Sequence, residues 1–191
     1  MLRFSASGLS LLVAASFLCS AGAQSNRQPE KSGGAAKVII PKVEPRPEDV
    51  STIDGMVRAY FEVVSGPAGR KREWGRDATL YAPGMRFLIF REDQSGKTSV
   101  RTLTHQEFVD ESEVALAGKA FYEREVHRIT HRAGNVVHVF CTAEQKSSPA
   151  GPVEGRSIDS LEMYWDGSRW WITSANIWEV GTEALPMEFL P

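Results

Sequence analysis

Residues 161–180 read LEMYWDGSRWWITSANIWEV, with two runs of aromatic and β-branched residues on either side of Asp166-Gly167. Asp-Gly between such runs is a strong β-hairpin signal, because both central residues of a type I′ turn need a positive φ. Four of the five tryptophans of the chain lie in this stretch. The pattern therefore predicts a closing antiparallel sheet that buries large rings, either around a cavity or against a partner.

Upstream of this hairpin, apolar residues at helical spacing predict a helix that begins near Ser51 and ends at Gly66-Pro67. Thr104 and Glu107 form the capping-box pattern of a second long helix. Further runs predict a short helix at 70–74 and strands at 77–81, 86–91, 121–130, 136–144 and 156–165. Helices followed by a long meander are typical of an α+β fold. We expect a cone: a curved antiparallel sheet wrapped around N-terminal helices.

The first 23 residues have the pattern of a secretory signal peptide. Arg3 precedes a short apolar core at 9–18, and residues 21–23 (AGA) form a small-residue cleavage site. A retained anchor is the alternative, although the apolar run is short for a membrane span. The prediction is a secreted or periplasmic protein, free of the membrane after cleavage. A net charge of −2 is no footprint of nucleic-acid or anionic-membrane binding.

Residues 24–48 are rich in Pro, Lys, Glu, Gln and Gly, and they predict a disordered linker. Residues 49–191 are then one domain. Cleavage after residue 23 removes Cys19 and leaves Cys141 as the sole cysteine, so an intramolecular disulfide is not expected. Cys141 shares its predicted strand face with valines and an alanine, which indicates a small buried hydrophobic residue.

Four segments carry a resemblance to a known family: FYEREVHR (121–128), VVHVFCTAEQK (136–146), GRSIDSLEMYWDGSRWWI (155–172) and LPMEFLP (185–191). With the order of predicted elements from residue 49 to about 180, they resemble uncharacterised secreted bacterial members of the SnoaL-like and nuclear transport factor 2-like superfamily. The resemblance implies the cystatin-like cone fold. It specifies activity poorly, because that superfamily includes isomerases, cyclases, dehydratases, binding modules and dimerisation domains.

The steroid isomerase branch of this superfamily offers a test. It uses a tyrosine of the first helix as an oxyanion donor, and Tyr60 resembles that tyrosine. It also places a general-base aspartate directly before a proline, where this sequence has Ala82 before Pro83. A methyl group cannot accept a proton, so isomerisation by that route is disfavoured. Tyr60 is then expected in the core or in a pocket wall.

Strand alternation predicts that Glu125 and His127 share one face, and hairpin pairing about Gly134 could bring them close to His138. A carboxylate beside an imidazole in an apolar cone would be an acid–base pair, because burial and pairing tune both pKa values. The alternative is a solvated outer face with charge pairs between strands.

A second candidate group comprises Arg156, Asp159, Asn176 and Trp178 on the last strands. Asp159 is also a candidate acid–base residue, and Arg156 could hold a carboxylate or phosphate of a ligand. The alternative for Arg156 is a salt bridge to Asp159 or Glu154. Aromatic residues would wall the ligand pocket: Tyr60, Phe87, Phe140, Trp171 or Trp178.

No metal site or cofactor is predicted. His127 and His131 have helical i, i+4 spacing, but they lie in a predicted strand where the two rings do not converge. Three functions remain open: binding of a small apolar or carboxylate-bearing molecule, ranked first, a lyase or isomerase-type enzyme, and a homodimeric interaction module. Alternation places Trp170 and Trp178 on one face and Trp171 on the other, so one set lines the cone.

Overall fold

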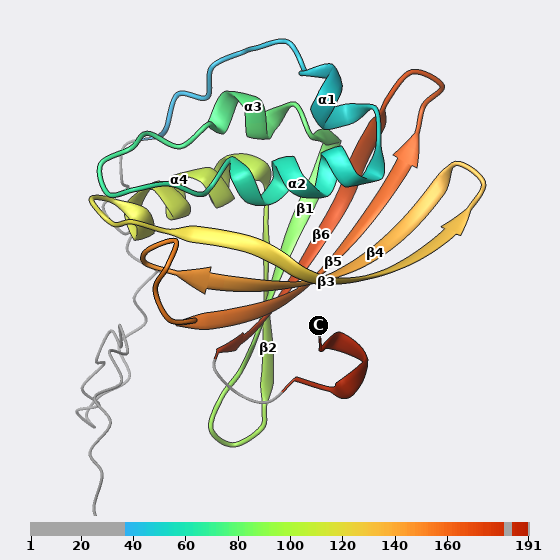
Figure 1. The fold of residues 1–191 in the computed structure, drawn as a ribbon. Coiled ribbons are helices and arrows are strands. Elements are labelled where there is room, and N and C mark those ends of the chain that lie inside the picture. The colour runs from blue at the N-terminus through green and yellow to red at the C-terminus, as the bar shows by residue number, and fades with distance from the viewer. Residues whose placement is uncertain (1–36, 182–184, 191) are drawn as a thin grey trace, which may run out of the picture. The chain divides into compact units, whose positions relative to one another are not determined.

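The computed structural model describes residues 37–181 and 185–190. The predicted signal peptide lies outside them, and among them no helix is long and apolar enough to cross a membrane. The helices are α1 (Pro47–Val50), α2 (Ile53–Glu62), α3 (Trp74–Ala78), α4 (His105–Leu116) and the 3-10 helix η1 (Met187–Phe189). The strands are β1 (Tyr81–Glu92), β2 (Thr98–Leu103), β3 (Tyr122–Ala133), β4 (Val136–Lys146), β5 (Gly155–Trp165) and β6 (Trp170–Gly181) (Figure 1).

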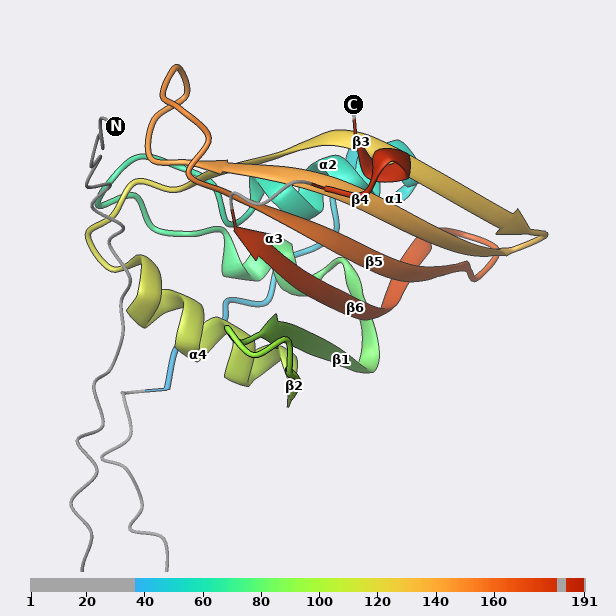
Figure 2. The ribbon, with the colours of Figure 1, turned by 90° about the horizontal axis from the view of Figure 1, so that it is seen from below.

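The six strands form one sheet in the order β2-β1-β6-β5-β4-β3. All neighbouring pairs are antiparallel except β1 and β6, which run parallel. Helices α1 to α4 lie over one face of the curved sheet, and η1 lies on the other face beside β3 and β4 (Figures 1 and 2). The predicted α+β fold class is therefore confirmed. The prediction of an antiparallel sheet did not include the parallel pairing of β1 with β6.

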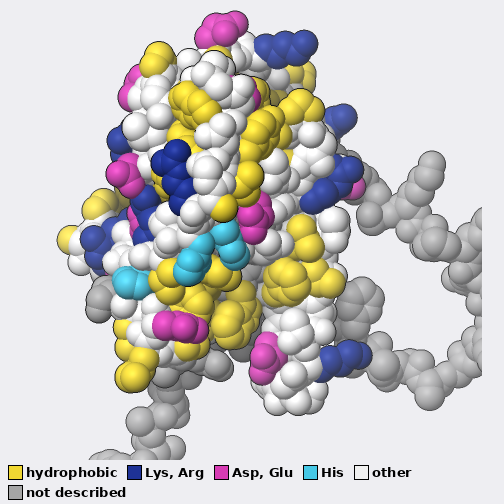
Figure 3. Space-filling model, turned by 90° about the vertical axis from the view of Figure 1, so that its right-hand side faces the viewer, with side chains coloured by type: hydrophobic (Ala, Val, Ile, Leu, Met, Phe, Trp, Pro, Cys, Tyr) yellow, Lys and Arg dark blue, Asp and Glu magenta, His cyan; other side chains and the backbone are white. Residues whose placement is uncertain are grey.

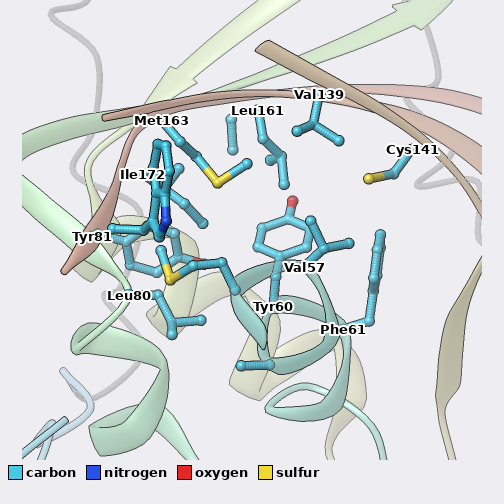
Figure 4. Close-up of a cluster of buried hydrophobic side chains, with 14 of the residues drawn as sticks. Val57, Tyr60, Phe61, Leu80, Tyr81, Val139, Cys141, Leu161, Met163 and Ile172 are labelled. Atoms are coloured by element: carbon cyan, nitrogen blue, oxygen red, sulfur yellow. The ribbon is translucent and has the colours of Figure 1, made fainter. Parts of the chain in front are cut away.

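The main core lies between α2 and the concave face of the sheet (Figure 4). Helix α2 presents Met56, Val57 and Phe61, which are 3% exposed or less, to buried residues of β4, β5 and β6. Full burial of a side chain of this size contributes roughly 1.5–3 kcal/mol. The apolar face predicted for this helix thus packs α2 across the sheet. In this position the Tyr60 hydroxyl points toward the strands (Figure 4).

The starts of the two long helices follow local capping. Thr104 accepts a hydrogen bond from Glu107 N while Glu107 caps the Thr104 N–H, so the predicted capping box is confirmed. At α2 the cap is Thr52, whose side chain accepts from Gly55 N at 2.9 Å, rather than Ser51. The Ser51 hydroxyl instead donates to the carbonyl of Pro47 in α1.

The region from residue 74 to residue 103 differs most from the prediction. Asp77 and Ala78 end helix α3 and do not begin a strand. Strand β1 does not stop at Pro83-Gly84 but runs through them, with a register irregularity between Tyr81 and Arg86. Gly84 has a φ of +81°, which a residue with a Cβ adopts only with strain. Strand β2 was not predicted, because its residues are exposed except the last and lack an apolar pattern.

Two β-bulges change which residues share a face. In β3 the register shifts between Glu125 and His127, and in β6 it shifts at Thr173, between Ile172 and Ser174. A bulge adds one residue to a strand, so the alternation of side chains reverses beyond it. The face assignments predicted by strict alternation are therefore wrong on the far side of both bulges.

Residues 37–46 differ from the predicted linker, because they pack against the domain. Val38 N donates to Asp110 Oδ1 at 2.8 Å, and Gln106 Nε2 donates to the Val38 carbonyl at 3.0 Å. Val38 and Ile40 also pack against a small apolar cluster that includes Trp74 and Val109. The short apolar run at 38–40 is thus sufficient to fasten this segment to α3 and α4.

Candidate functional site

A cavity of about 170 Å³ lies between α2, α4 and the concave face of the sheet. One part of its wall is apolar: Val64, Ile89, Phe108, Leu116, Phe121 and Ile177. The polar part comprises Tyr60, Glu123, Gln145, Asp159 and Glu179. None of the described residues that line it is Lys, Arg or His. A mainly apolar cavity with a few convergent polar groups is the usual form of a small-molecule site.

Asp159 and Tyr60 form the deepest polar contact of this cavity. Asp159 is 2% exposed, and its Oδ2 accepts a hydrogen bond from the Tyr60 hydroxyl at 3.0 Å. The other oxygen, Oδ1, is buried and has no partner in hydrogen-bond geometry among the described residues, although the Ser157 hydroxyl, which is also buried and unpaired, is close enough to lower the pKa of Asp159. A buried polar atom without a partner is unusual and calls for a functional or structural explanation.

Glu123 and Glu179 bring two more carboxyl groups to the wall. Gln145 Nε2 donates to Glu123 Oε1 at 2.8 Å, and Glu123 is partly buried. Glu179 is bound by Arg91 through two contacts, Nε to Oε2 at 2.6 Å and Nη2 to Oε1 at 2.9 Å. Arg91 therefore balances the charge of Glu179, whereas Glu123 and Asp159 make hydrogen bonds only to neutral side chains.

Burial sets the protonation of these groups. It raises the pKa of Asp159 from 3.8 to about 6, although the Ser157 and Tyr60 hydroxyls, which favour the ionised carboxylate, act in the opposite direction. Burial also raises the pKa of Glu123 from 4.5 to about 8, and the nearby charge of Asp159 adds to this rise. Near neutral pH the pair therefore holds one proton, on Glu123, and Asp159 is ionised. Burial raises the pKa of Tyr60 well above 10, so its hydroxyl stays a donor.

The predicted acid–base pair of Glu125 with a histidine is not formed. The bulge in β3 places Glu125 opposite the core residue Ala143, but His127 opposite Thr142 on the other face. Glu125 binds Arg128, whose Nε lies 2.5 Å from its Oε1. On the outer face, His138 Nε2 lies 2.7 Å from Ser160 Oγ. The solvated-face alternative therefore describes these histidines, and Figure 3 shows histidine side chains at the surface beside apolar ones.

Most of the other predicted ligand-binding residues do not line the cavity. Arg156 lies on the face of the sheet opposite to Ala143 and Gln145. It forms a salt bridge with Glu144 at 3.5 Å, and not with Asp159 or Glu154 as the sequence suggested. The remaining four are Phe87 in the core and, on the outer face, Phe140, Asn176 and Trp178. Of the residues predicted from the sequence, the structure brings Tyr60 and Asp159 together in the cavity wall, and their role in binding stays a prediction. His138 and Phe140 also lie in contact, with ring centroids 4.4 Å apart, but on the outer face.

The four tryptophans of the closing hairpin divide differently from the alternation pattern. Trp170 is buried in the same core cluster as Ile172, as was predicted for one of the two alternating sets of residues. The bulge at Thr173 moves Trp178 to the outer face, where it is 37% exposed, and Trp171 binds Asp166 in the turn. The homodimer predicted for an exposed tryptophan face stays a prediction.

Two further sites carry polar groups, most of which are already paired. Asp77 accepts from the Tyr81 hydroxyl at 2.9 Å and lies 2.7 Å from His105 Nε2, which ties α3, β1 and α4 together outside the cavity. A groove of about 600 Å³ lies between residues 38–46 and α3. Its charges include Glu73 with Arg76 at 3.0 Å and Glu113 with the Trp74 Nε1 at 2.7 Å. These contacts serve the fold. Arg72 also lines the groove, and its Nη1 is buried without a hydrogen-bond partner among the described residues.

Other candidates from the sequence lie elsewhere. Ala82 is not among the residues that line the cavity, so an acidic residue at this position would not belong to the group of carboxyls there. Cys141 is fully buried on the concave face, and burial raises the pKa of its thiol, as expected for a small hydrophobic residue. The described residues contain no group of three or more His, Cys, Asp or Glu side chains that could hold a metal ion.

No protein-family model matches the chain, and no curated protein matches it. Solved structures are similar at low identity. One from Caulobacter vibrioides, an uncharacterised protein with a cystatin-like fold, has a TM-score of 0.47 at 15% identity over 69% of this chain and 89% of that one. One from Silicibacter pomeroyi, described as nuclear transport factor 2-like and of unknown function, has a TM-score of 0.44 at 13% identity over 68% and 93%.

Sequence reasoning missed Glu123, Gln145, Glu179 and the wall of α4. Glu123 stands two residues before Glu125, on the same face of β3 and before the bulge, so alternation alone could have included it. The contribution of α4 had no comparable signal, because its contact with the sheet depends on how β1 and β2 turn the chain.

Proposed function

We propose that this domain binds a small, largely apolar molecule in the cavity between α2, α4 and the sheet. The observation that supports this most is the wall of the cavity itself, which is mainly apolar and has the buried Asp159 and Tyr60 at its polar end. An apolar cavity of about 150 Å³ accommodates benzene, so about 170 Å³ suits a single ring with one substituent. Secretion of the domain, predicted from residues 1–23, is part of this proposal and rests on the sequence alone.

Binding of benzyl alcohol tests this proposal. In the unmodified protein, we expect the alcohol to shift the methyl NMR signals of Ile89 and Ile177, which line the cavity, with millimolar or tighter affinity. In Ser112→Trp the new ring enters the cavity from α4 and should abolish the shifts. Val114→Trp is the matched control, since Val114 is 61% exposed on the same helix. Equal shifts in both variants, or none in the unmodified protein, would contradict the proposal.

A second candidate function is acid–base catalysis of the isomerase or lyase type. It is favoured by the raised pKa values of two neighbouring carboxyl groups, which leave Asp159 ionised and Glu123 protonated near neutral pH. Asp159 would accept a proton from a carbon of the substrate. Glu123 would return a proton to another carbon, or to a departing hydroxyl group that leaves as water. Atoms balance in both reactions without a cofactor.

Exchange of the α-hydrogens of cyclohexanone in D₂O measures this proton transfer. If the second candidate function holds, the unmodified protein accelerates the exchange, and Asp159→Asn lowers the protein-dependent rate by about 10²-fold or more, because an amide is a poor base. Glu188→Gln, at an exposed carboxyl of the C-terminal segment, should leave the rate unchanged. A rate that Asp159→Asn does not alter would exclude catalysis by this group.

A further inference from the structure

The polar end of the cavity has an excess of hydrogen-bond acceptors. Glu179 is balanced by Arg91, but Asp159 receives one hydrogen bond from Tyr60 and Glu123 receives one from Gln145. Neither of these two donors carries a charge. Two other arginines of the sheet are engaged elsewhere: Arg128 binds Glu125 and Asp54, and Arg156 binds Glu144 on the outer face.

The Asp159 carboxylate is the group that a ligand would complete. Asp159 lies in the cavity wall, and its carboxylate is held in place through Oδ2 by Tyr60. Tyr60 is itself 6% exposed and is part of the core, so this contact is preorganised. The other oxygen, Oδ1, is covered by the protein and has no partner in hydrogen-bond geometry among the described residues, so a ligand donor reaches it only when a neighbouring side chain such as Ser157 moves.

We propose that the ligand is a ring-sized apolar molecule that carries an amine, and that its ammonium group pairs with the carboxylate of Asp159. This inference rests on the proposed binding function and narrows it to one class of ligand. A buried ammonium beside an ionised carboxylate forms a neutral pair, and hydrogen bonds to charged groups are the stronger ones. Opposite the ammonium, the ring would contact the apolar wall that includes Phe108 and Leu116.

The same reasoning corrects the sequence-based expectation of a carboxylate-bearing ligand. That expectation depended on Arg156, which lies on the outer face of the sheet. A ligand carboxylate in this cavity would meet Asp159 and Glu123 and would find no cationic partner among the described lining residues. Like charges in a low-dielectric site repel strongly, so such a ligand would bind only with an added proton.

Three compounds with the same ring separate these cases: benzylamine, benzyl alcohol and benzoate. Titrations of the full-length protein at neutral pH, followed by calorimetry or NMR, give three dissociation constants. We expect benzylamine to bind about tenfold more tightly than benzyl alcohol, and benzoate to bind at least about tenfold more weakly than the alcohol. This comparison uses the unmodified protein only, so it does not depend on the folding of any variant.

Asp159→Asn then assigns the preference to one group. Asparagine has the size of aspartate and can still accept from Tyr60, but it lacks the charge. We expect the variant to lose about tenfold in benzylamine affinity and to keep its benzyl alcohol affinity within about threefold. Glu188→Gln removes the same charge at an exposed position and should change neither constant.

The outcomes distinguish this inference from the function on which it rests. If benzyl alcohol binds but benzylamine binds no better, or if benzoate binds as tightly as benzylamine, the amine inference is wrong and the binding function stands. A benzylamine preference that persists in Asp159→Asn also overturns it. If none of the three compounds binds, both the inference and the proposed function are wrong.

Discussion

Replacement of Arg76 by Met is expected to destabilise the domain by about 3–5 kcal/mol, since it would leave the buried Asp49 without its main partner. Asp49 is fully buried, and Arg76 binds it through two hydrogen bonds, Nε to Oδ2 at 2.7 Å and Nη2 to Oδ1 at 2.8 Å. Hydrogen bonding to Asp49 raises the pKa of Arg76, so the cation persists at every accessible pH. Arg58 is the only other described cation that pairs with Asp49, and it is 3.8 Å away and half exposed.

Urea denaturation measures this loss as a change in the free energy of unfolding. Arg58→Met is the control, and it should cost less than about 1 kcal/mol because the Arg58 side chain is half exposed and its contact with Asp49 is long, at 3.8 Å. The double variant Asp49→Leu/Arg76→Met removes both charges and should recover part of the stability, because replacing both partners by apolar residues avoids an unpaired buried charge. A loss below about 1 kcal/mol in Arg76→Met would show that water or Arg58 compensates for the missing guanidinium.

This ion pair joins α1 to α3, and its position could not be predicted from the sequence. Asp49 and Arg76 are 27 residues apart, and each is an ordinary charged residue in its own local pattern. The features that could be predicted are local ones. The turn at Asp166-Gly167 is of this kind, with Gly167 at a φ of +104°, as is the capping box at Thr104. In both cases the residues that decide the structure lie within a few positions of one another.

For a related reason, only some residues of the candidate site could be predicted from the sequence. Tyr60 and Asp159 were each identified by their place on a helix stripe or a late strand, but their contact spans 99 residues and depends on the fold. Alternation failed at the bulges in β3 and β6, where one inserted residue moves His127 and Asn176 to the outer face. A bulge leaves no reliable pattern in a single sequence, so face assignments beyond it required the structure.

The last prediction concerns pH. Replacement of Glu123 by Gln should make the domain relatively more stable as the pH rises from about 5 to 8. Burial raises the pKa of Glu123 from 4.5 to about 8, so the folded state keeps this proton to a higher pH than the unfolded state does. Because the folded state binds more protons in this window, the free energy of unfolding falls as pH rises, by up to about 1.4 kcal/mol per pH unit for one group. Glutamine has no proton to lose, so the variant lacks this fall.

The quantity to measure is the difference in unfolding free energy between Glu123→Gln and the unmodified protein, from urea denaturation at pH 5, 6, 7 and 8. The difference cancels every group that titrates equally in both proteins, and it should grow in favour of the variant by roughly 2 kcal/mol or more across the window. Glu92→Gln, at an exposed carboxyl, should give a flat difference. If the difference for Glu123→Gln were also independent of pH, Glu123 would be ionised in the folded protein at pH 7. The assignment of one proton to Glu123 and Asp159 near neutral pH would then be wrong.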